Sequence, residues 1–413
     1  MLLSKKTKEL FFGLLVSLFS LLVIECIARI AYTFHEDIKA NKEKWWVYSK
    51  TLGWELNPGF HGNVMEEVNI IERRFDNKGF LYSDTSKILD QSKPKVIFIG
   101  DSSTFGYRLQ MKSTFVEILG NQLSDISTIN LGVPGYTSFQ GYKVLLKRGL
   151  ELNPKIVVVS FNLNDRRYVL GKEFIDSDEL FKKTYEISER NKLLQRIYLY
   201  RAIKYLFVRL GVTGDEELAA RNRFKNINIS NLRARVSPDN YRRNLEDIIK
   251  LSRTKNIHVV FLILNDNPFE KEYLTKGIEL FNNQKYDLAI EKFIIAYRFN
   301  NFFSVLAQQY LEKTYRKLGL TEEANRYSVL EMPINHQHGG RAIYLDTEYN
   351  QIMRDVAIRY NIETIEAGKV LDKNPSNYLD VCHPDENGNR EIAFLLSRSI
   401  NRLLNKRGSS RRQ

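Results

Sequence analysis

The sequence predicts an α/β fold in which a parallel β-sheet carries helices on both faces. Short apolar runs of the kind that form buried parallel strands alternate with helical patterns along the chain. Polar or glycine-containing turns follow three of these runs, at the edge where such sheets bind ligands. With 43% hydrophobic and 27% charged residues, the composition is that of a globular protein. It excludes a wholly disordered, collagen-like or coiled-coil chain.

Five apolar runs are the predicted strands of the sheet. They are Lys95–Ile99, Ile126–Leu131, Lys155–Phe161, Ile257–Leu264 and Asn361–Ile365. Helical patterns lie between and after these runs. They cover Thr114–Leu123, a stretch from a capping Ser138 to about Leu150, about Asn240–Arg253, and a C-terminal helix with an inward face of Ile392, Leu395, Leu396, Ser399, Ile400 and Leu403. Turn signals within residues 51–92 predict irregular β structure upstream of the sheet.

One apolar segment near the N-terminus predicts a membrane anchor. Leu10–Ile24 carries no charge and reaches the roughly 20 residues of a membrane span only when it is extended to Ala31. Glu25 and Arg29 lie four apart within that extension and can pair on one helix face. A cleaved signal peptide and a buried core helix are the alternatives. We expect an uncleaved single-pass anchor in the cell membrane. Lys5, Lys6 and Lys8 precede the apolar segment, and such charges favour the cytoplasmic side of a membrane. We therefore expect a cytoplasmic N-terminus and an extracytoplasmic remainder.

The chain is basic, with a net charge of +13 and a pI of about 9.4. Such a charge suits nucleic acid, an anionic membrane surface or an acidic polymer. No nucleic-acid-binding signature is present, and the basic surface is expected outside the cytoplasm, so nucleic acid is not an expected partner. Residues 166–256 carry +9 of the charge and include apolar residues at helical spacing, namely Leu199, Ile203, Leu206 and Leu210. This helix could lie on the membrane or cover the site as a lid. A helix packed on the sheet with a solvated basic face is the interpretation we favour.

A second interruption of the α/β pattern, residues 268–332, predicts a small helical insertion. Its small and aromatic residues have the spacing of a tetratricopeptide repeat: Gly277, Tyr286, Ala289, Phe293 and Ala296, with Ala324 in a weaker second unit. Two such units are too few to fold alone, so they should pack on the α/β domain. The insertion is either a plain helical hairpin or a docking surface for a protein partner.

The expected organisation has five parts. They are residues 1–34 (cytoplasmic tip and anchor), 35–92 (juxtamembrane and irregular β segment), 93–267 (first part of the α/β domain, with a basic helical insertion at 166–239), 268–332 (helical insertion) and 333–413 (second part of the α/β domain and basic tail).

Residues at the predicted strand ends suggest nucleophilic catalysis. Ser102 follows a strand and precedes a helix, a turn that exposes the serine near a helix N-terminus. Asp380 and His383 are three apart, so that one turn can place the carboxylate against the imidazole and fix its tautomer. His383 could then accept the proton of Ser102. Alone, His383 is as well explained as a loop or capping residue; together with Ser102 it predicts a catalytic triad.

Acyl transfer also requires hydrogen-bond donors for the developing oxyanion. The backbone N–H groups of Ser102 and Gly132 and the side-chain amide of Asn164 are the candidates, because each follows a predicted strand. Taken alone, Asn164 with Asp165 would be read as a turn or helix cap.

Four sequence blocks, in the right order, resemble the SGNH (GDSL-type) serine esterase and acyltransferase family. They are Gly100-Asp101-Ser102-Ser103, Asn130-Leu131-Gly132, Asn162-Leu163-Asn164-Asp165 and Asp380-Val381-Cys382-His383. The resemblance covers roughly residues 50–165, 240–265 and 355–404, and the 52–59 stretch resembles membrane-anchored bacterial members. It implies a flavodoxin-like three-layer fold, Ser102 as nucleophile, Asp380 and His383 as its triad partners, and Ser102, Gly132 and Asn164 as the oxyanion hole. In one departure, Asn162 replaces the usual glycine, which is expected to narrow the adjacent pocket.

Two functions are compatible with these features. The first is an esterase or O-acyltransferase of the cell envelope that forms an acyl-serine on an acylated carbohydrate or lipid. The second is an envelope assembly protein that recruits a partner through 268–332 and whose serine site is idle. Neither requires a metal or organic cofactor. The spacing of His336 and His338 indicates a polar loop rather than a metal site, and the two cysteines, Cys26 and Cys382, exclude a disulfide framework.

Overall fold

The computed structural model describes residues 5–36, 44–66, 69–81, 92–170, 175–209, 232–267, 269–298, 302–328, 348–380 and 382–409. The chain forms two units, each described by itself. The first comprises Met1–Lys44 and Lys182–Ile227, and the second Trp45–Phe181 and Asn228–Gln413. His336, His338 and Leu210, named above, lie outside the described residues.

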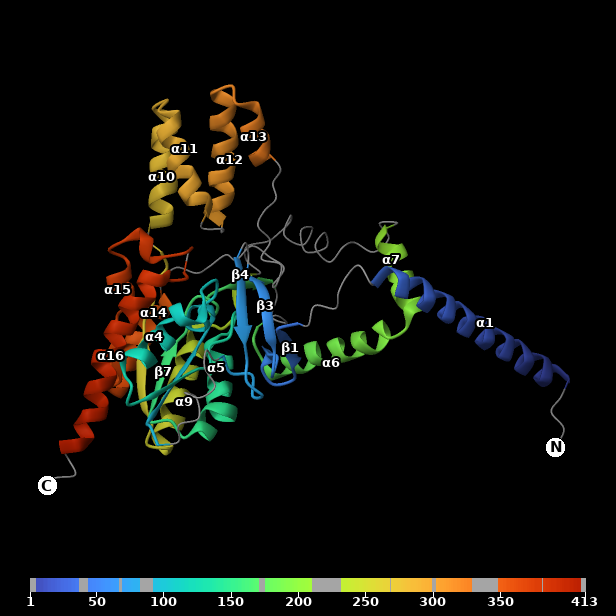
Figure 1. Cartoon of the computed structure of the whole chain (residues 1–413), viewed down its shortest axis with the longest axis horizontal. Helices are drawn as coiled ribbons and strands as arrows, with labels where there is room; N and C mark the ends of the chain where they lie inside the picture. The colour runs from blue at the N-terminus through green and yellow to red at the C-terminus, as the bar shows by residue number, and fades with distance from the viewer. Residues whose placement is uncertain are drawn as a thin grey trace. The chain divides into compact units, whose positions relative to one another are not determined.

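A five-stranded parallel sheet forms the centre of the second unit (Figure 1). Its strand order is β11-β10-β7-β5-β6, and each neighbouring pair is parallel. Each predicted strand overlaps one of these elements, so the predicted parallel α/β fold is confirmed. The strands are β5 (Lys95–Gly100), β6 (Ser127–Asn130), β7 (Ile156–Ser160), β10 (His258–Leu262) and β11 (Glu363–Ile365).

The strands contribute alternate residues to two hydrophobic cores, one on each face of the sheet. In β5, Ile97 and Ile99 belong to one core, and Val96 and Phe98 belong to the other. Every residue of β5 is buried, which explains why it is a continuous apolar run rather than an alternating one. Helices α5 (Ser138–Val144), α9 (Pro238–Thr254) and α14 (Glu348–Tyr360) supply the first core, and α4 (Phe115–Gln122), α15 (Gly368–Leu371) and α16 (Glu386–Ser409) supply the second.

The start of α5 differs from the prediction. Thr137, not Ser138, is its N-cap, because Thr137 forms a reciprocal capping box with Gln140. Ser138 is the first residue of the helix, and both its backbone N–H and its hydroxyl donate to Asp165 Oδ1, at 2.9 and 2.6 Å. The expected helix to Leu150 continues past α5 only as a π-turn and a 3-10 turn, Leu145–Gly149 and Leu150–Leu152.

Antiparallel hairpins precede the sheet, where irregular β structure was predicted. Strands β1 (Trp46–Ser49) and β2 (Gly53–Leu56) form one, and β3 (His61–Glu66) and β4 (Asn69–Arg74) form another. Their apolar side chains join the first core of the sheet; they include Leu52, Leu56, Phe60, Val64 and Phe75. A further pair, β8 (Tyr168–Leu170) and β9 (Leu232–Ala234), follows the third predicted site block. These hairpins lie against the sheet and are part of the same unit.

The predicted helical insertion consists of four helices that pack side by side (Figure 1). They are α10 (Phe269–Asn282), α11 (Tyr286–Arg298), α12 (Phe302–Lys317) and α13 (Thr321–Ser328). They bury their own apolar cluster, in which Ala289, Phe293 and Ala296 are fully enclosed. A Cβ at Gly277 would lie 2.6 Å from the Phe293 ring, so this position requires the close approach that only glycine allows. The extra all-helical region is therefore present, whereas its identity as a tetratricopeptide repeat stays a prediction.

The first unit contains α1 (Lys5–Glu36), most of α6 (Asp178–Gln195) and α7 (Tyr198–Arg209). Residues Glu9–Ile30 of α1 have a mean hydropathy of 2.5 and are long enough to cross a membrane, a property that anchors share with signal sequences. Helix α7 packs on α1 within this unit. Packing of this basic helix on the sheet, the interpretation that we favoured, stays a prediction. Periodicity identified an apolar face but could not identify what that face contacts.

The carboxyl group of Asp165 links β7 to α5 and is expected to make stability depend on pH. Burial raises its pKa to about 8, and its second oxygen, Oδ2, has no partner among the described residues. The folded protein then holds a proton that the unfolded chain releases near the ordinary pKa of 3.8. The free energy of unfolding consequently falls as pH rises between about 4 and 8, by up to about 1.4 kcal/mol per pH unit.

The substitution Asp165→Asn should remove this dependence, because asparagine mimics the protonated acid and still accepts from Ser138. Urea unfolding of both proteins at pH 5, 7 and 9 tests this expectation. The variant should gain stability relative to the wild type as pH rises. Parallel pH curves for the two proteins would mean that Asp165 does not hold its proton in the folded state.

Candidate active site

The first block forms a tight turn between β5 and a short helix, α3 (Ser102–Phe105). Asp101 is the N-cap of α3, and its carboxylate accepts the backbone N–H of Ser103 at 2.9 Å. A Cβ on Gly100 would lie 2.0 Å from Thr104 Oγ1, so glycine is required at the end of the strand. The turn places Ser102 as the first residue of α3, beyond the carboxyl edge of the sheet.

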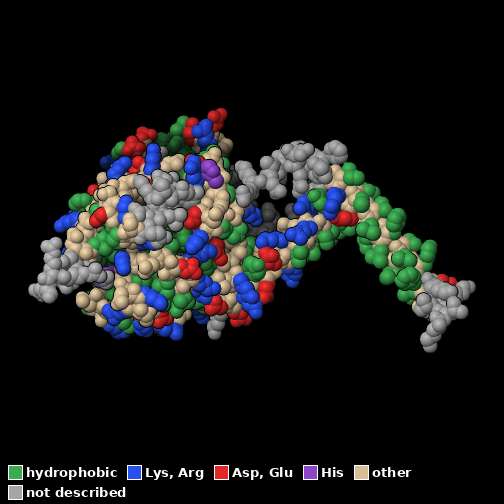
Figure 2. Space-filling view, turned by 60° about the horizontal axis from the view of Figure 1, so that its bottom comes forward, with side chains coloured by type: hydrophobic (Ala, Val, Ile, Leu, Met, Phe, Trp, Pro, Cys, Tyr) green, Lys and Arg blue, Asp and Glu red, His purple; other side chains and the backbone are tan. Residues whose placement is uncertain are grey.

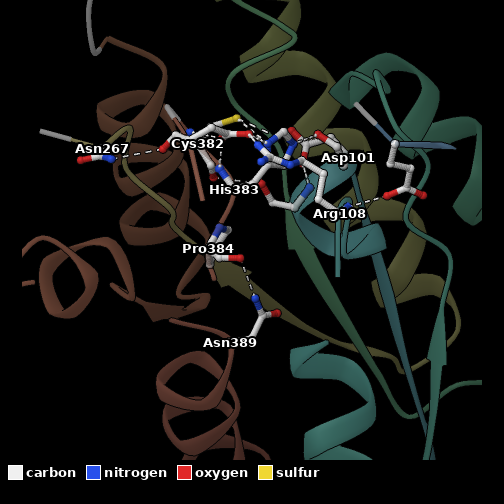
Figure 3. Close-up of polar contacts among 11 residues, drawn as sticks. Asp101, Arg108, Asn267, Cys382, His383, Pro384 and Asn389 are labelled. Carbon is white, nitrogen blue, oxygen red and sulfur yellow. Dashed lines mark hydrogen bonds and ion pairs between the residues drawn. The ribbon is translucent and has the colours of Figure 1, made fainter. Parts of the chain in front are cut away.

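The three predicted triad residues, Ser102, His383 and Asp380, are in hydrogen-bond contact with His383 in the middle. Ser102 Oγ lies 2.7 Å from His383 Nε2, and His383 Nδ1 lies 2.7 Å from Asp380 Oδ2. Figure 3 shows His383 within this group of polar contacts. The side chains of His383 and Asp380 are 13% and 5% exposed, so solvent reaches the imidazole only in part. The sheet thus brings together a serine and a histidine that are 281 residues apart.

The Asp380 carboxylate is buried and strongly hydrogen-bonded. Its Oδ1 accepts the backbone N–H groups of Cys382 and His383, at 3.0 and 2.8 Å. These bonds close the single turn that the three-residue spacing predicted. Burial alone would raise the pKa of Asp380, but the neighbouring His383 and these hydrogen bonds overcome it and lower the pKa to about 2. The group therefore stays ionised across the neutral range and keeps its negative charge beside the imidazole.

Two of the three predicted oxyanion donors, Gly132 and Asn164, already have partners inside the protein. The Gly132 N–H donates to the side-chain oxygen of Asn130 at 2.9 Å. Asn164 Nδ2 donates to Asp101 Oδ2 at 3.3 Å, and its second amide hydrogen points elsewhere by geometry. Binding of an oxyanion would therefore require the Gly132 N–H to be shared or released. Their role as an oxyanion hole stays a prediction.

Glycine at position 132 is required by the close packing of two backbone segments. A Cβ there would lie 2.6 Å from the Phe105 nitrogen and 2.9 Å from the Thr104 carbonyl carbon. Asn130 also joins these two segments, because its side-chain amide nitrogen donates to the Thr104 carbonyl at 2.7 Å. The second sequence block thus holds α3, and with it Ser102, in place.

An arginine that sequence reasoning missed contacts the triad. Arg108 Nη1 donates to Asp380 Oδ2 at 3.2 Å, the same oxygen that faces His383 (Figure 3). The backbone N–H of Arg108 donates to Glu66 Oε2 on strand β3 at 2.5 Å. Glu66 in turn forms a fully buried, two-pronged ion pair with Arg73 on β4, at 2.7 Å for each bond. No sequence pattern indicated this chain of contacts, because its members come from separate segments.

Asp380, Cys382 and His383 also present atoms that could hold a metal ion, all within 4.8 Å of one another. The chemistry of these donors does not favour one. Burial raises the pKa of the Cys382 thiol well above its ordinary value, and metals bind the thiolate. The Asp380 carboxylate already accepts four hydrogen bonds. The site is better suited to proton transfer than to metal binding.

A small cavity lies beside the first block, at the ends of β5, β7 and β10. Its volume is about 20 Å³, enough for about one water molecule. Asp101, Asn162 and Cys382 are among its lining residues. The Asn162 amide donates to Asn350 Oδ1 at 2.9 Å, so this side chain is held against α14 in the place where glycine was expected. Asn162 therefore occupies space that a glycine would leave open.

A parallel α/β sheet with a serine, a histidine and an aspartate in contact at its carboxyl edge is typical of serine hydrolases. The sequence profile of the GDSL-like lipase/acylhydrolase family matches residues 98–391 of this chain. The chain belongs to this family, as the sequence blocks predicted.

Several solved structures are similar to the chain, with TM-scores of 0.35 to 0.36. A lipase/acylhydrolase from Enterococcus faecalis is 14% identical, and the match covers 74% of this chain and 95% of that one (TM-score 0.36). A psychrotrophic esterase from a Pseudoalteromonas species is 13% identical over 76% and 100% of the two chains (TM-score 0.36). A GDSL-like lipase from Bacteroides thetaiotaomicron is 11% identical over 76% and 91% (TM-score 0.35). No curated protein matches the chain.

Replacement of Arg108 by glutamine is expected to lower kcat on an aryl acetate by about tenfold or more, because a hydrogen bond to a charged group contributes about 1.5–3 kcal/mol. The guanidinium repels a protonated imidazole that shares Asp380 with it. Its removal therefore favours the protonated base, and the acid limb of the pH–rate profile should move up by roughly one unit.

The matched control is Arg108→Lys, which keeps the charge and should leave the acid limb nearly in place. Asp101, whose pKa burial raises to about 6, titrates in the same range and is unchanged in both variants. If Arg108→Gln reduces kcat without moving the acid limb, the arginine has only a structural role.

Proposed function

We propose that this protein is a serine esterase or O-acyltransferase of the cell envelope, acting through an acyl-serine intermediate on an acylated carbohydrate or lipid. The observation that carries the proposal is the 2.7 Å contact between Ser102 Oγ and His383 Nε2, with Asp380 on the other ring nitrogen. Family membership supports the coarser statement that the enzyme hydrolyses esters. The acceptor, the substrate class and the envelope location belong to the proposal.

In the first half of the proposed reaction, Ser102 Oγ attacks the ester carbonyl carbon as His383 Nε2 takes the serine proton. Asp380, ionised throughout, stabilises the imidazolium that forms. The carbonyl oxygen becomes an oxyanion, which would accept from the N–H groups of Ser102 and Gly132 and from the Asn164 amide. The carbon–oxygen bond to the leaving alcohol then breaks, and His383 returns its proton to that alcohol.

In the second half, an acceptor hydroxyl attacks the acyl-serine and loses its proton to His383. Water gives hydrolysis, and a sugar hydroxyl gives acyl transfer. The ester bond to Ser102 breaks, and the serine regains its proton from the imidazolium. Besides the ester and the acceptor hydroxyl, these steps use Ser102, His383, Asp380 and the proposed oxyanion donors.

The envelope location rests on α1. Its apolar segment follows lysines that favour a cytoplasmic N-terminus, which would leave the second unit outside the cytoplasm. Acylated carbohydrates and lipids are the esters abundant in that compartment, so they are preferred to free metabolites as substrates.

The alternative, an assembly protein with an idle serine, depends on helices α10–α13. The residues that gave the tetratricopeptide pattern pack against one another within these helices, which explains the pattern without a partner. A partner of this surface stays a possibility to be tested by deletion of 268–332, whereas the contacts at Ser102 favour catalysis.

A fluorophosphonate probe is expected to label the full chain at Ser102, because the probe reacts with serines activated by a base. Ser102→Ala and His383→Ala should abolish labelling, a loss of at least a hundredfold, and Asp380→Asn should reduce it strongly through loss of the imidazole's orientation. Gel fluorescence and intact mass measure the adduct.

Ser397→Ala, at a serine on α16 outside the site, is the matched control and should label as the wild type does. Folded protein that is not labelled, or labelling that survives in Ser102→Ala, would contradict the proposed function. Incubation with an acetylated glycan and a second sugar would then separate hydrolysis from transfer by the product formed.

A further inference from the structure

The first unit contains a contact that explains a charged residue within the apolar helix α1. Glu25 lies inside the segment Glu9–Ile30, where an ionised side chain is costly and needs partners. Its two carboxylate oxygens accept the backbone N–H groups of Tyr198 and Leu199, at 2.9 and 2.8 Å. These are the first two residues of α7, so Glu25 caps the N-terminus of that helix. The residue before α7, Ile197, has no side-chain oxygen with which to do so.

Aromatic and basic side chains reinforce this junction. Two guanidinium groups contact the Tyr198 ring, those of Arg29 on α1 and Arg201 on α7, at 5.0 and 4.7 Å from its centroid. Arg29 is also within 3.7 Å of Glu25. Glu25 and Arg29 therefore both serve the contact with α7, which gives α1 a structural partner in the same unit.

The depth of this contact follows from the helix geometry. Glu25 lies five residues before the end of the apolar segment at Ile30, which at about 1.5 Å per residue places it about 7 Å inside that end. Helices that lie in the plane of a membrane interface bury their apolar faces about 5–10 Å below the headgroups. The N-terminus of α7 is thus held at the depth of an interfacial helix.

The side chains of α7 match that environment. Ile203, Leu206 and Phe207 are 44%, 54% and 42% exposed, which would be unfavourable in water. Exposed apolar side chains also line α1, as is apparent along that helix in Figure 2. Residues 190–209 contain six Lys or Arg and no Asp or Glu, a composition that favours anionic lipid headgroups.

We propose that α7 is an interfacial helix, docked on α1 by Glu25, whose apolar face lies in the outer leaflet of the membrane and whose basic residues contact anionic lipid headgroups. This inference rests on the envelope anchor of the proposed function. It also requires that α1 is retained in the mature protein, because cleavage would leave the α7 N-terminus without its cap.

The test uses the full chain in nanodiscs of phosphatidylcholine and phosphatidylglycerol. Cys26→Ser removes the exposed native thiol, and Leu206→Cys provides a site for the fluorophore NBD. Lipids with a nitroxide near the headgroup should quench NBD at 206 at least threefold more than NBD at Ile358→Cys, an 81% exposed position on α14. Omission of phosphatidylglycerol should weaken the quenching, and quenching that is unchanged without it would overturn the contact with anionic headgroups.

Glu25→Gln is the specific variant, since it keeps the side-chain shape and makes α1 more apolar. It should at least halve the quenching at 206 while the chain resists carbonate extraction. Equal quenching at 206 and 358 would overturn the proposal, and so would blue-shifted NBD emission that nitroxide lipids do not affect, which indicates cover by another protein chain. Intact mass showing loss of residues 1–30 in cells would overturn it as well. Fluorophosphonate labelling of the same samples reports separately on the serine site.

Discussion

The buried charge of Asp380 is the constraint on which the active-site architecture depends. A carboxylate removed from water must be compensated by hydrogen bonds, and this one accepts four of them. They come from its own turn, from His383 and from Arg108 after α3. The same charge that orients the imidazole thus ties the C-terminal segment to the first block of the domain. Loss of any one donor leaves the charge less compensated and the imidazole less well held.

The N-terminal hairpin of β3 and β4 extends this constraint beyond the sheet. Glu66 and Arg73 form an ion pair that is almost entirely enclosed, and Arg73 also donates to the Gly106 carbonyl at the end of α3. Glu66 accepts the backbone N–H of Arg108, a residue held at a positive φ of 66°. Such backbone conformations persist only where the surroundings impose them. The hairpin therefore positions the Arg108 backbone so that its side chain contacts Asp380. It contributes no atom to the serine–histidine pair.

Sequence reasoning succeeded where the information is local. The five strands, the close approach at Gly277 and the turn that joins Asp380 to His383 all follow from spacing and residue size within a few positions. It failed where the partner is distant: Arg108, which contacts Asp380, was missed. Ser138, which contacts Asp165, was given the capping role of Thr137. No local pattern reveals such contacts, because the partners of Arg108 and Ser138 lie in other segments of the chain. Glu25 was recognised as paired, yet only with Arg29 on its own helix.

The hydrogen bond from the Gly132 N–H to Asn130 affects how strongly the site would favour the transition state of the proposed reaction over the bound ester. That N–H donates to a neutral amide oxygen, a bond that contributes about 0.5–1.5 kcal/mol, whereas a bond to a charged group contributes about 1.5–3 kcal/mol. A neutral ester carbonyl would gain little by displacing Asn130. The oxyanion of the tetrahedral state would gain more, because it carries the charge. An N–H that is occupied at rest would therefore discriminate between substrate and transition state, and stabilisation of the transition state alone is what accelerates a reaction.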